Sequence, residues 1–245
     1  MKTVRHVWIL LLAAHLAAVL VAVARGGWAG FCTMAVLHLA WVRITLWPGS
    51  TPFGKAVESF PLTTREVILT IDDGPCGDTG AVLDLLDRYQ ARAVFFLIGS
   101  RASARPGDVA GIIARGHQIQ NHTLTHPSAT FWAAGPARLR REIAGGSEIL
   151  TKLTGQTPQW FRAPAGFRNP FTAPILRECG LRCMGWAARG FDTRRTDPAK
   201  VLLRMRPEFR PGVVLLVHQG HPQSLAVIEA VLVALKEDGF GTCLP

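Results

Sequence analysis

The chain has 245 residues and a formal net charge of +10, with 49% hydrophobic and 18% charged residues. Its lysines and arginines are scattered and are not interleaved with aromatic side chains, so the charge indicates a nearby membrane and not a nucleic-acid partner. The five cysteines include no Cys-x-x-Cys pair, which argues against a disulfide framework and a thiolate zinc site and favours a reducing compartment.

The first fifty residues contain most of the excess apolar sequence. Val7 to Ala24 carries no formal charge and is near the length that spans a bilayer, and Lys2 and Arg5 before it place the N-terminus in the cytoplasm. A cleaved signal peptide ending at residues 22–24 is the competing interpretation. It leaves the second apolar stretch, Gly26 to Trp47, unexplained.

Two topologies follow from that second stretch. If it also spans the membrane, the downstream domain faces the cytoplasm, with basic residues on the side that they prefer; we favour this arrangement. If it lies at the interface, with Trp41 and Trp47 as anchors, the domain lies outside. We therefore predict residues 1–50 as an anchor of one or two transmembrane segments in the inner (cytoplasmic) membrane, bound to membrane lipid, and residues 51–65 as a linker.

Residues 66–245 form one domain-sized block in which predicted strands and helices alternate. Such alternation predicts an α/β fold with a parallel sheet, and about seven units favour a closed or nearly closed barrel. The strands are predicted at residues 67–71, 93–98, 118–120, 159–161, 181–185, 213–217 and 239–244. The helices are predicted at residues 79–89, 106–114, 136–153, 170–178, 198–205 and 224–236. Candidate functional residues follow several of these strands, as barrel enzymes require: Asp72, His122, Arg162, Asp192 and His218.

An acidic pair, Asp72 and Asp73, ends the first predicted strand and precedes Gly74-Pro75. A strand sends successive side chains to opposite sides, so one carboxylate can bind a cation while the other holds a water molecule. The alternative is a solvated turn, because Asp, Gly and Pro are common turn residues.

Two histidines, His122 and His126, lie four residues apart after the third predicted strand. In a helical turn or a tight loop, this spacing lets both imidazoles reach one cation. Two histidines and one carboxylate leave a coordination position for water or substrate, which is typical of a catalytic metal site. The alternative is that the histidines cap a turn or fill the core.

Five motifs follow one another within residues 66–245. They are Thr-Ile-Asp-Asp-Gly-Pro at 70–75, Asn-His-Thr-Leu-Thr-His-Pro at 121–127, Phe-Arg-Ala-Pro-Ala-Gly at 161–166, a lone Asp192, and Leu-Leu-Val-His-Gln-Gly at 215–220. In this order they resemble the motifs of the polysaccharide deacetylase family, the NodB homology domain. The resemblance implies a distorted (β/α) barrel and a hydrolase of carbon–nitrogen bonds other than peptide bonds. Such an enzyme removes an acetyl or formyl group from an amino sugar in a polysaccharide or a glycolipid. Its partner is then an acylated amino-sugar polymer or a lipid-linked sugar.

By similarity, Asp73, His122 and His126 bind one divalent metal ion. Zinc is the first choice, and cobalt or another transition metal accepts the same ligands. The resemblance assigns Asp72 as general base and Arg162 as the cation that pairs with it and keeps it charged.

It also assigns His218 as general acid, oriented by Asp192, which raises its pKa. Pro164 and the backbone N–H of Ala165 belong to the loop that holds the oxyanion and the substrate. His117 and His221 are interpreted as structural or rim residues.

The chain departs from the family at two places. Ala165 stands where an aromatic residue is frequent, and Asp192 is followed by Arg194 and Arg195 and not by the usual acidic residue and tryptophan. The two arginines either favour an anionic substrate, such as a phosphate-bearing glycolipid, or form a solvated basic loop. Two other functions stay open: a non-catalytic member that binds a carbohydrate or glycolipid, and a metallohydrolase such as a phosphodiesterase. The second would require more carboxylate ligands and a second metal.

Overall fold

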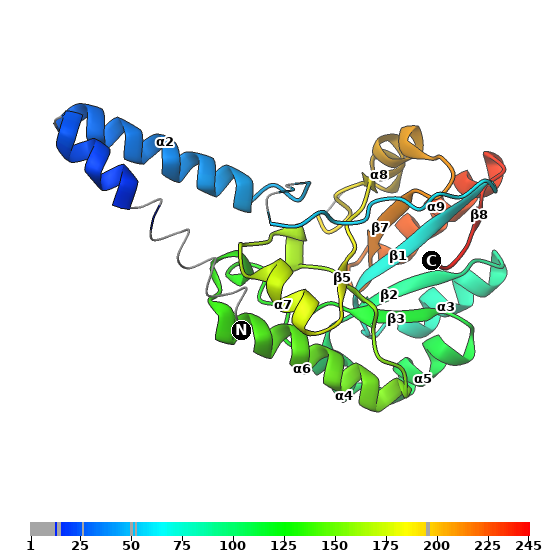
Figure 1. The fold of residues 1–245 in the computed structure, drawn as a ribbon. Coiled ribbons are helices and arrows are strands. Elements are labelled where there is room, and N and C mark those ends of the chain that lie inside the picture. The colour runs from blue at the N-terminus through cyan, green and yellow to red at the C-terminus, as the bar shows by residue number, and fades with distance from the viewer. Residues whose placement is uncertain (1–12, 14–15, 26, 50, 52, 195–196) are drawn as a thin grey trace.

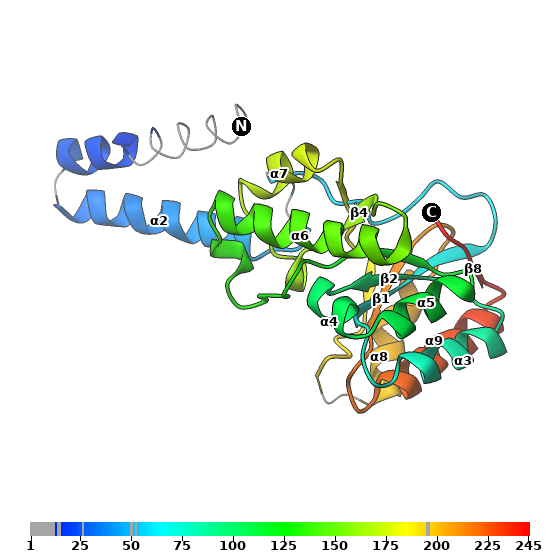
Figure 2. The ribbon, with the colours of Figure 1, turned by 90° about the horizontal axis from the view of Figure 1, so that it is seen from below.

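The computed structural model describes residues 13, 16–25, 27–49, 51, 53–194 and 197–245. Residues 16–25 are helical, and α2 (Gly27–Thr45) follows them and extends away from the rest of the molecule in both views (Figures 1 and 2). Many of its apolar side chains are exposed, Trp28, Phe31 and Leu39 among them.

The expected membrane-spanning helices find no support in the described part of the chain. No helix there is long and apolar enough to cross a bilayer. The first expected segment, residues 7–24, falls partly on residues 1–12 and 14–15, which lie outside the described residues.

Seven parallel strands form a curled sheet in the order β5-β4-β3-β2-β1-β7-β6, which confirms the expected parallel α/β barrel (Figure 1). A further short strand, β8 (Gly241–Thr242), pairs with the start of β1. The strands of the path are β1 (Glu66–Gly74), β2 (Ala93–Leu97), β3 (Gln118–Asn121), β4 (Trp160–Phe161), β5 (Arg182–Cys183), β6 (Ala188–Arg189) and β7 (Val214–His218). Only residues 184–187 separate the two edge strands, β5 and β6, so the sheet is bent back on itself.

The helices lie outside this sheet, as the views from two directions show (Figures 1 and 2). They are α3 (Thr79–Arg88), α4 (Gly99–Ala104), α5 (Pro106–Ala114), α6 (Pro136–Thr154), α7 (Thr172–Glu178), α8 (Pro198–Met205) and α9 (Ser224–Glu237). The longest of them, α6, begins at Pro136 and ends before Gly155, whose left-handed backbone (φ 70°) favours glycine. The predicted helices are therefore confirmed, and α4 is an addition.

The two faces of β1 divide the core. Leu69 and Ile71 pack with the outer helices, whereas Ile68 packs inside the barrel against residues such as Phe96 and Trp160. Side chains alternate along a strand, so Thr70 and Asp72 share the inner face with Ile68. The inner face thus carries polar groups only toward its C-terminal end, where the candidate site lies.

Candidate active site

The acidic pair at the end of β1 does not alternate as expected. Asp73 has a left-handed backbone (φ 72°), and the pairing of β1 with β2 shifts between Asp72 and Gly74. As a result both carboxylates approach the same ring nitrogen: His122 Nε2 lies 3.7 Å from Asp72 Oδ2 and 3.4 Å from Asp73 Oδ1. The expectation of opposite sides was wrong because the regular strand ends at this bulge.

The two histidines lie in a loop after β3 that hydrogen bonds hold in shape. Asn121 Oδ1 accepts from the backbone N–H of Thr123 (2.7 Å), and Thr123 Oγ1 accepts from the backbone N–H of His126 (2.9 Å). Asn121 is buried and its amide donates to Ile143 O (2.7 Å) on α6. Thr123 and His126 both have positive φ angles, so a tight loop, and not a helical turn, brings the two imidazole centroids to 4.6 Å.

Asp73, His122 and His126 can hold a metal ion. One ligand atom from each lies within 4.8 Å of the others. His122 Nδ1 is 2.8 Å from the backbone oxygen of Arg162, which can only accept, so Nδ1 carries the proton and Nε2 presents its lone pair. Asp73 Oδ1 is buried without a hydrogen-bond partner, as expected for an atom reserved for a cation.

The charge states of this group also suit a divalent cation. Burial, reinforced by the charge of His122, lowers the pKa of His126 to about 4, so its imidazole is neutral at pH 7. Burial alone would raise the pKa of Asp73, but its closeness to His122, and then to His126 and His218, holds it well below its usual range. An ionised carboxylate and neutral imidazole are the forms that bind metal.

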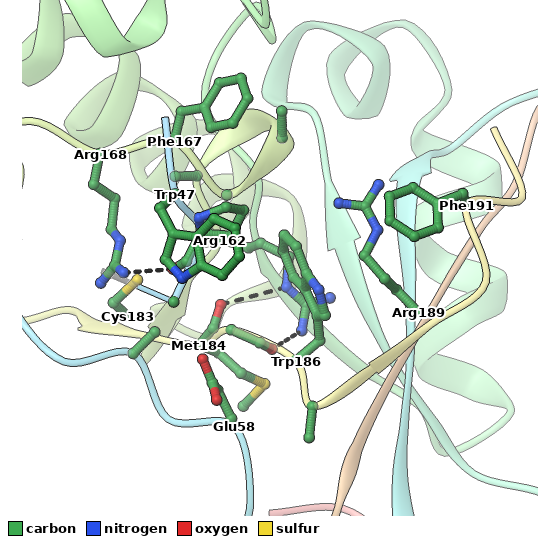
Figure 3. Close-up of a pocket in the computed structure, with 18 of the residues that line it drawn as sticks. Trp47, Glu58, Arg162, Phe167, Arg168, Cys183, Met184, Trp186, Arg189 and Phe191 are labelled. Carbon is green, nitrogen blue, oxygen red and sulfur yellow. Dashed lines mark hydrogen bonds between the residues drawn. The ribbon is translucent and has the colours of Figure 1, made fainter. Parts of the chain in front are cut away.

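Arg162 is fully buried inside the barrel and fixes Asp72. Its Nη1 donates to Asp72 Oδ1 and to Thr70 Oγ1, each at 2.7 Å. Its Nη2 donates to Gly185 O (2.7 Å) and its Nε contacts Met184 O (3.4 Å) (Figure 3). Its guanidinium also lies over the ring of Phe96, 4.1 Å from the ring centroid. With one oxygen engaged by Arg162, Asp72 directs its other oxygen toward His122.

His218 and Asp192 form a second pair on the other side of β1. His218 Nδ1 lies 2.9 Å from Asp192 Oδ1, and the His218 backbone N–H donates to Asp192 Oδ2 at 2.7 Å. Burial opposes protonation of this histidine, but the hydrogen bond and charge of Asp192, with the charges of Asp72 and Asp73, raise the pKa of His218. The imidazole is therefore suited to carry a proton that its Nε2 can release.

Pro164 and Ala165 form a short 3-10 turn (Pro164–Gly166) at the end of β4. Ala165 is exposed with φ 53°, and Gly166 follows with φ 74°. A Cβ at Gly166 would come within 2.5 Å of Trp186 and 2.8 Å of Pro48, so only glycine fits there. The turn lines a pocket of about 790 Å³ that also reaches Arg162 and Trp186 (Figure 3).

A model of the polysaccharide deacetylase family matches residues 61–184, about half of the chain. The chain belongs to the polysaccharide deacetylase family. The enzyme class expected from the motifs, a hydrolase of carbon–nitrogen bonds other than peptide bonds, is thereby confirmed.

Relatives and solved structures agree with the family. A chitooligosaccharide deacetylase from a Bradyrhizobium species is 29% identical, and the match covers 72% of this chain and 87% of the relative. A peptidoglycan-N-acetylglucosamine deacetylase from Bacillus cereus is 30% identical over 88% of this chain and 73% of its own length. The family 4 carbohydrate esterase from Streptomyces lividans, solved in complex with acetate, is 28% identical with a TM-score of 0.68, covering 73% of this chain and 92% of that chain.

The structure of this deacetylase family member adds pocket residues that the motifs did not indicate. Trp47, Trp186, Arg189 and Phe191 line the pocket beside Arg162 (Figure 3). Trp186, Arg189 and Phe191 precede Asp192 within one short segment, and this closeness to a motif residue is the sequence signal that could have indicated them. Trp47 comes from the predicted membrane anchor, and no pattern placed it near the site.

The two histidines interpreted as structural or rim residues lie away from the metal-binding group. His117 is buried, and its Nδ1 accepts from the backbone N–H of Ala93 at 3.2 Å. His221 lines a second pocket that Asp192 and Arg194 also line, and its backbone N–H donates to Ser224 Oγ at 2.9 Å.

Proposed function

We propose that this chain removes an N-acyl group, acetyl or formyl, from an amino sugar with the help of one divalent cation held by Asp73, His122 and His126. The observation that carries the proposal is the convergence of this three-residue group with the Asp72–Arg162 and His218–Asp192 pairs at the C-terminal ends of neighbouring strands. A bound zinc, cobalt or similar ion supplies a Lewis acid and lowers the pKa of water.

The residues of the chain divide the proton transfers. Arg162 orients Asp72 by donating to one carboxylate oxygen, so the second oxygen can take a proton from the attacking water. His218, charged through Asp192, gives a proton to the departing nitrogen, and that transfer prevents the amine from leaving as an anion. The backbone N–H of Ala165 is the candidate donor to the oxygen on which negative charge develops.

The relatives support an N-acetylated substrate. Their names refer to chitooligosaccharide and to peptidoglycan N-acetylglucosamine, so we propose an acylated amino-sugar polymer or a lipid-linked sugar as the partner. The non-catalytic alternative is less well supported, because none of the proposed ligands, acid or base is replaced in this sequence.

We further propose that the N-terminal helices contact membrane lipid, with the catalytic part on the cytoplasmic side. The exposed apolar side chains of residues 16–25 and of α2 support this contact, since few soluble surfaces expose so many. Arg43 lies over the ring of Trp47 (4.0 Å), which brings together a cation and an aromatic ring suited to an interface.

Release of acetate from N-acetylchitotriose by the full chain tests the catalytic proposal. We expect activity that a chelator removes and that Zn²⁺ or Co²⁺ restores. A metal-loaded, folded protein that releases no acyl group from N-acetylchitotriose, from a phosphorylated N-acetyl sugar or from a lipid-linked one would overturn it.

A further inference from the structure

The pocket beside the catalytic centre contains an arginine whose charge is not neutralised by an ion pair. Arg162 is paired with Asp72, Arg168 donates to Pro48 O (2.7 Å) and to Gly54 O, and Arg210 is paired with Glu208 (2.8 Å). Among the residues that the structure describes, neither Arg189 nor Arg194 has a carboxylate partner. Arg194 is exposed, whereas Arg189 is half-buried, makes no hydrogen bond and has a buried, unsatisfied Nε.

Aromatic rings fix the position of Arg189. Its guanidinium lies 4.3 Å from the ring of Phe191 and 5.1 Å from that of Trp186, and the side chain stands between them in the pocket (Figure 3). The backbone is held as well, because Arg189 is paired with Leu216, two residues before His218. The arginine is thus presented beside the catalytic centre and is not a free surface side chain.

Two carboxylates, Asp192 and Asp72, act on Arg189 through their charges, but each forms its ion pair with another residue. Asp192 uses both oxygens on His218, and Asp72 uses one on Arg162 and directs the other toward His122. Burial lowers the pKa of Arg189, although the charges of Asp192 and Asp72 act in the opposite direction. A guanidinium nevertheless stays charged in proteins, and a half-buried charge without hydrogen bonds is costly. A ligand with an anionic group would remove that cost.

We propose that the acylated amino sugar carries a phosphate group and that Arg189 binds this phosphate in the pocket. This substrate class rests on the proposed function, because the phosphate is recognised by the same site that removes the acyl group. The guanidinium lies beside both rings with its Nε unpaired, and the fork of N–H groups on an arginine matches two phosphate oxygens at once. A neutral chitooligosaccharide offers no such partner.

The rest of the pocket fits an anionic ligand next to a lipid surface. Five arginines and two glutamates line it, so positive charge is in excess: Arg162, Arg168, Arg189, Arg194, Arg210, Glu58 and Glu208. One wall consists of residues 46–49, which directly follow α2 and its exposed apolar side chains. A phosphate that joins the sugar to a lipid would place the lipid toward that helix.

Substrate preference tests the proposal. The full chain is assayed with N-acetylchitotriose, with N-acetylglucosamine 1-phosphate, and with N-acetylglucosaminyl phosphate esterified to a polyprenol in detergent micelles. We expect wild type to prefer the phosphorylated sugars, and Arg189→Gln to lower the ratio of kcat/KM for phosphorylated over neutral substrate by about tenfold to a hundredfold. Arg189→Lys keeps the positive charge but loses the two parallel N–H donors of a guanidinium, so its ratio should lie between those of wild type and Arg189→Gln. Preference for the polyprenyl compound over N-acetylglucosamine 1-phosphate would identify the substrate as a lipid-linked sugar. Equal use of the two compounds would identify it as a free sugar phosphate.

A matched control is Arg182→Gln. Arg182 also stacks on an aromatic ring, that of Trp160 (3.9 Å), but does not line the pocket, so its ratio should equal that of wild type. An unchanged ratio in Arg189→Gln, with a thermal unfolding midpoint like that of wild type, would overturn the proposal. If wild type hydrolyses none of the three compounds, the proposed function fails, and calorimetric binding of N-acetylglucosamine 1-phosphate still decides the role of Arg189. The Kd for N-acetylglucosamine 1-phosphate should then be at least about tenfold higher in Arg189→Gln than in wild type, and an unchanged Kd would contradict phosphate binding by Arg189.

Discussion

Asp72 of β1 and His218 of β7 are direct partners in neighbouring parallel strands. The backbone N–H of Gln219 also donates to the backbone oxygen of Asp72 at 3.2 Å, so the strand ends are tied at this point. The proposed base and acid therefore come from adjacent strands that are buried along most of their length, and their separation is set by the sheet and not by a loop. This rigidity is what a site that transfers two protons in sequence requires.

Replacing Asp72 with Asn should remove turnover without removing the metal. Asn cannot accept a proton from water, so we expect kcat to fall by about 10²- to 10⁴-fold. Metal content is measured on the same preparation and should match that of wild type, because Asp73, His122 and His126 are unchanged. His126→Ala is the complementary variant, in which both metal and activity should be lost. An active Asp72→Asn protein would show that this residue is not the base.

The Asp192–His218 pair should set the alkaline limb of the pH profile. Asp192 raises the pKa of His218, and only the protonated imidazole can act as acid, so activity is lost as pH rises through that pKa. Asp192→Asn removes the negative charge, and the alkaline limb of kcat/KM should move to lower pH. The profile is measured with saturating metal. A limb that stays in place would assign the ionisation to another group.

Arg162 should contribute strongly to stability as well as to activity. Its loss leaves Asp72 as an uncompensated carboxylate in the barrel, so Arg162→Met is expected to lower the free energy of unfolding by about 3–5 kcal/mol. Arg140, which forms an exposed pair with Glu178 at 3.0 Å, provides the comparison, and Arg140→Met should cost less than about 1 kcal/mol. Urea unfolding of both variants gives the two values. Equal losses of unfolding free energy in the two variants would show that the buried Arg162–Asp72 pair contributes no more to stability than the exposed pair.

His117 should make the fold less stable in acid. Burial lowers the pKa of His117 to about 4 in the folded protein, against an ordinary value of 6.5, so below that value the unfolded chain binds a proton that the folded protein does not. Stability is therefore fully present above pH 6.5 and declines as the pH falls toward 4, by roughly 1–2 kcal/mol at pH 5. His117→Gln should reduce the difference in unfolding free energy between pH 7.5 and 5, measured in chelator.

The exposed His38 gives the control for that measurement. His38→Gln should keep the pH dependence of wild type. If His117→Gln also kept the pH dependence of wild type, groups other than His117 would cause the loss of stability in acid.

Sequence patterns predicted the long elements either from hydrophobic periodicity, as in α3, or from a continuous apolar run, as in β2. They missed β6, whose two residues Ala188–Arg189 are too few to show alternation, and α4, whose sequence Gly-Ser-Arg-Ala-Ser-Ala has no apolar stripe. The candidate ligands were found because their spacing is local, His122 with His126. The role of Arg189 could not be found in this way, since it depends on which carboxylates other strands have already engaged.

The bulge at Asp73 was equally invisible in the sequence. An alternating pattern assigns Asp72 and Asp73 to opposite faces, and only the left-handed backbone at Asp73 brings both toward His122. Asp accepts this conformation more readily than most residues, but its type alone does not demand it.

Residues 57–60, within the segment predicted as a linker, determine where the chain can be shortened. Val57 pairs with Met184 just after β5, and Ser59 pairs with Val213 at the start of β7, while Phe60 packs edge-on against Trp160. A recombinant form that began at residue 66 would leave these strand ends unpaired and open to association with other chains. It would also lose the pocket wall at residues 46–49. Expression of the catalytic part without its N-terminal helices should therefore start before Leu46, even though the family match begins at residue 61.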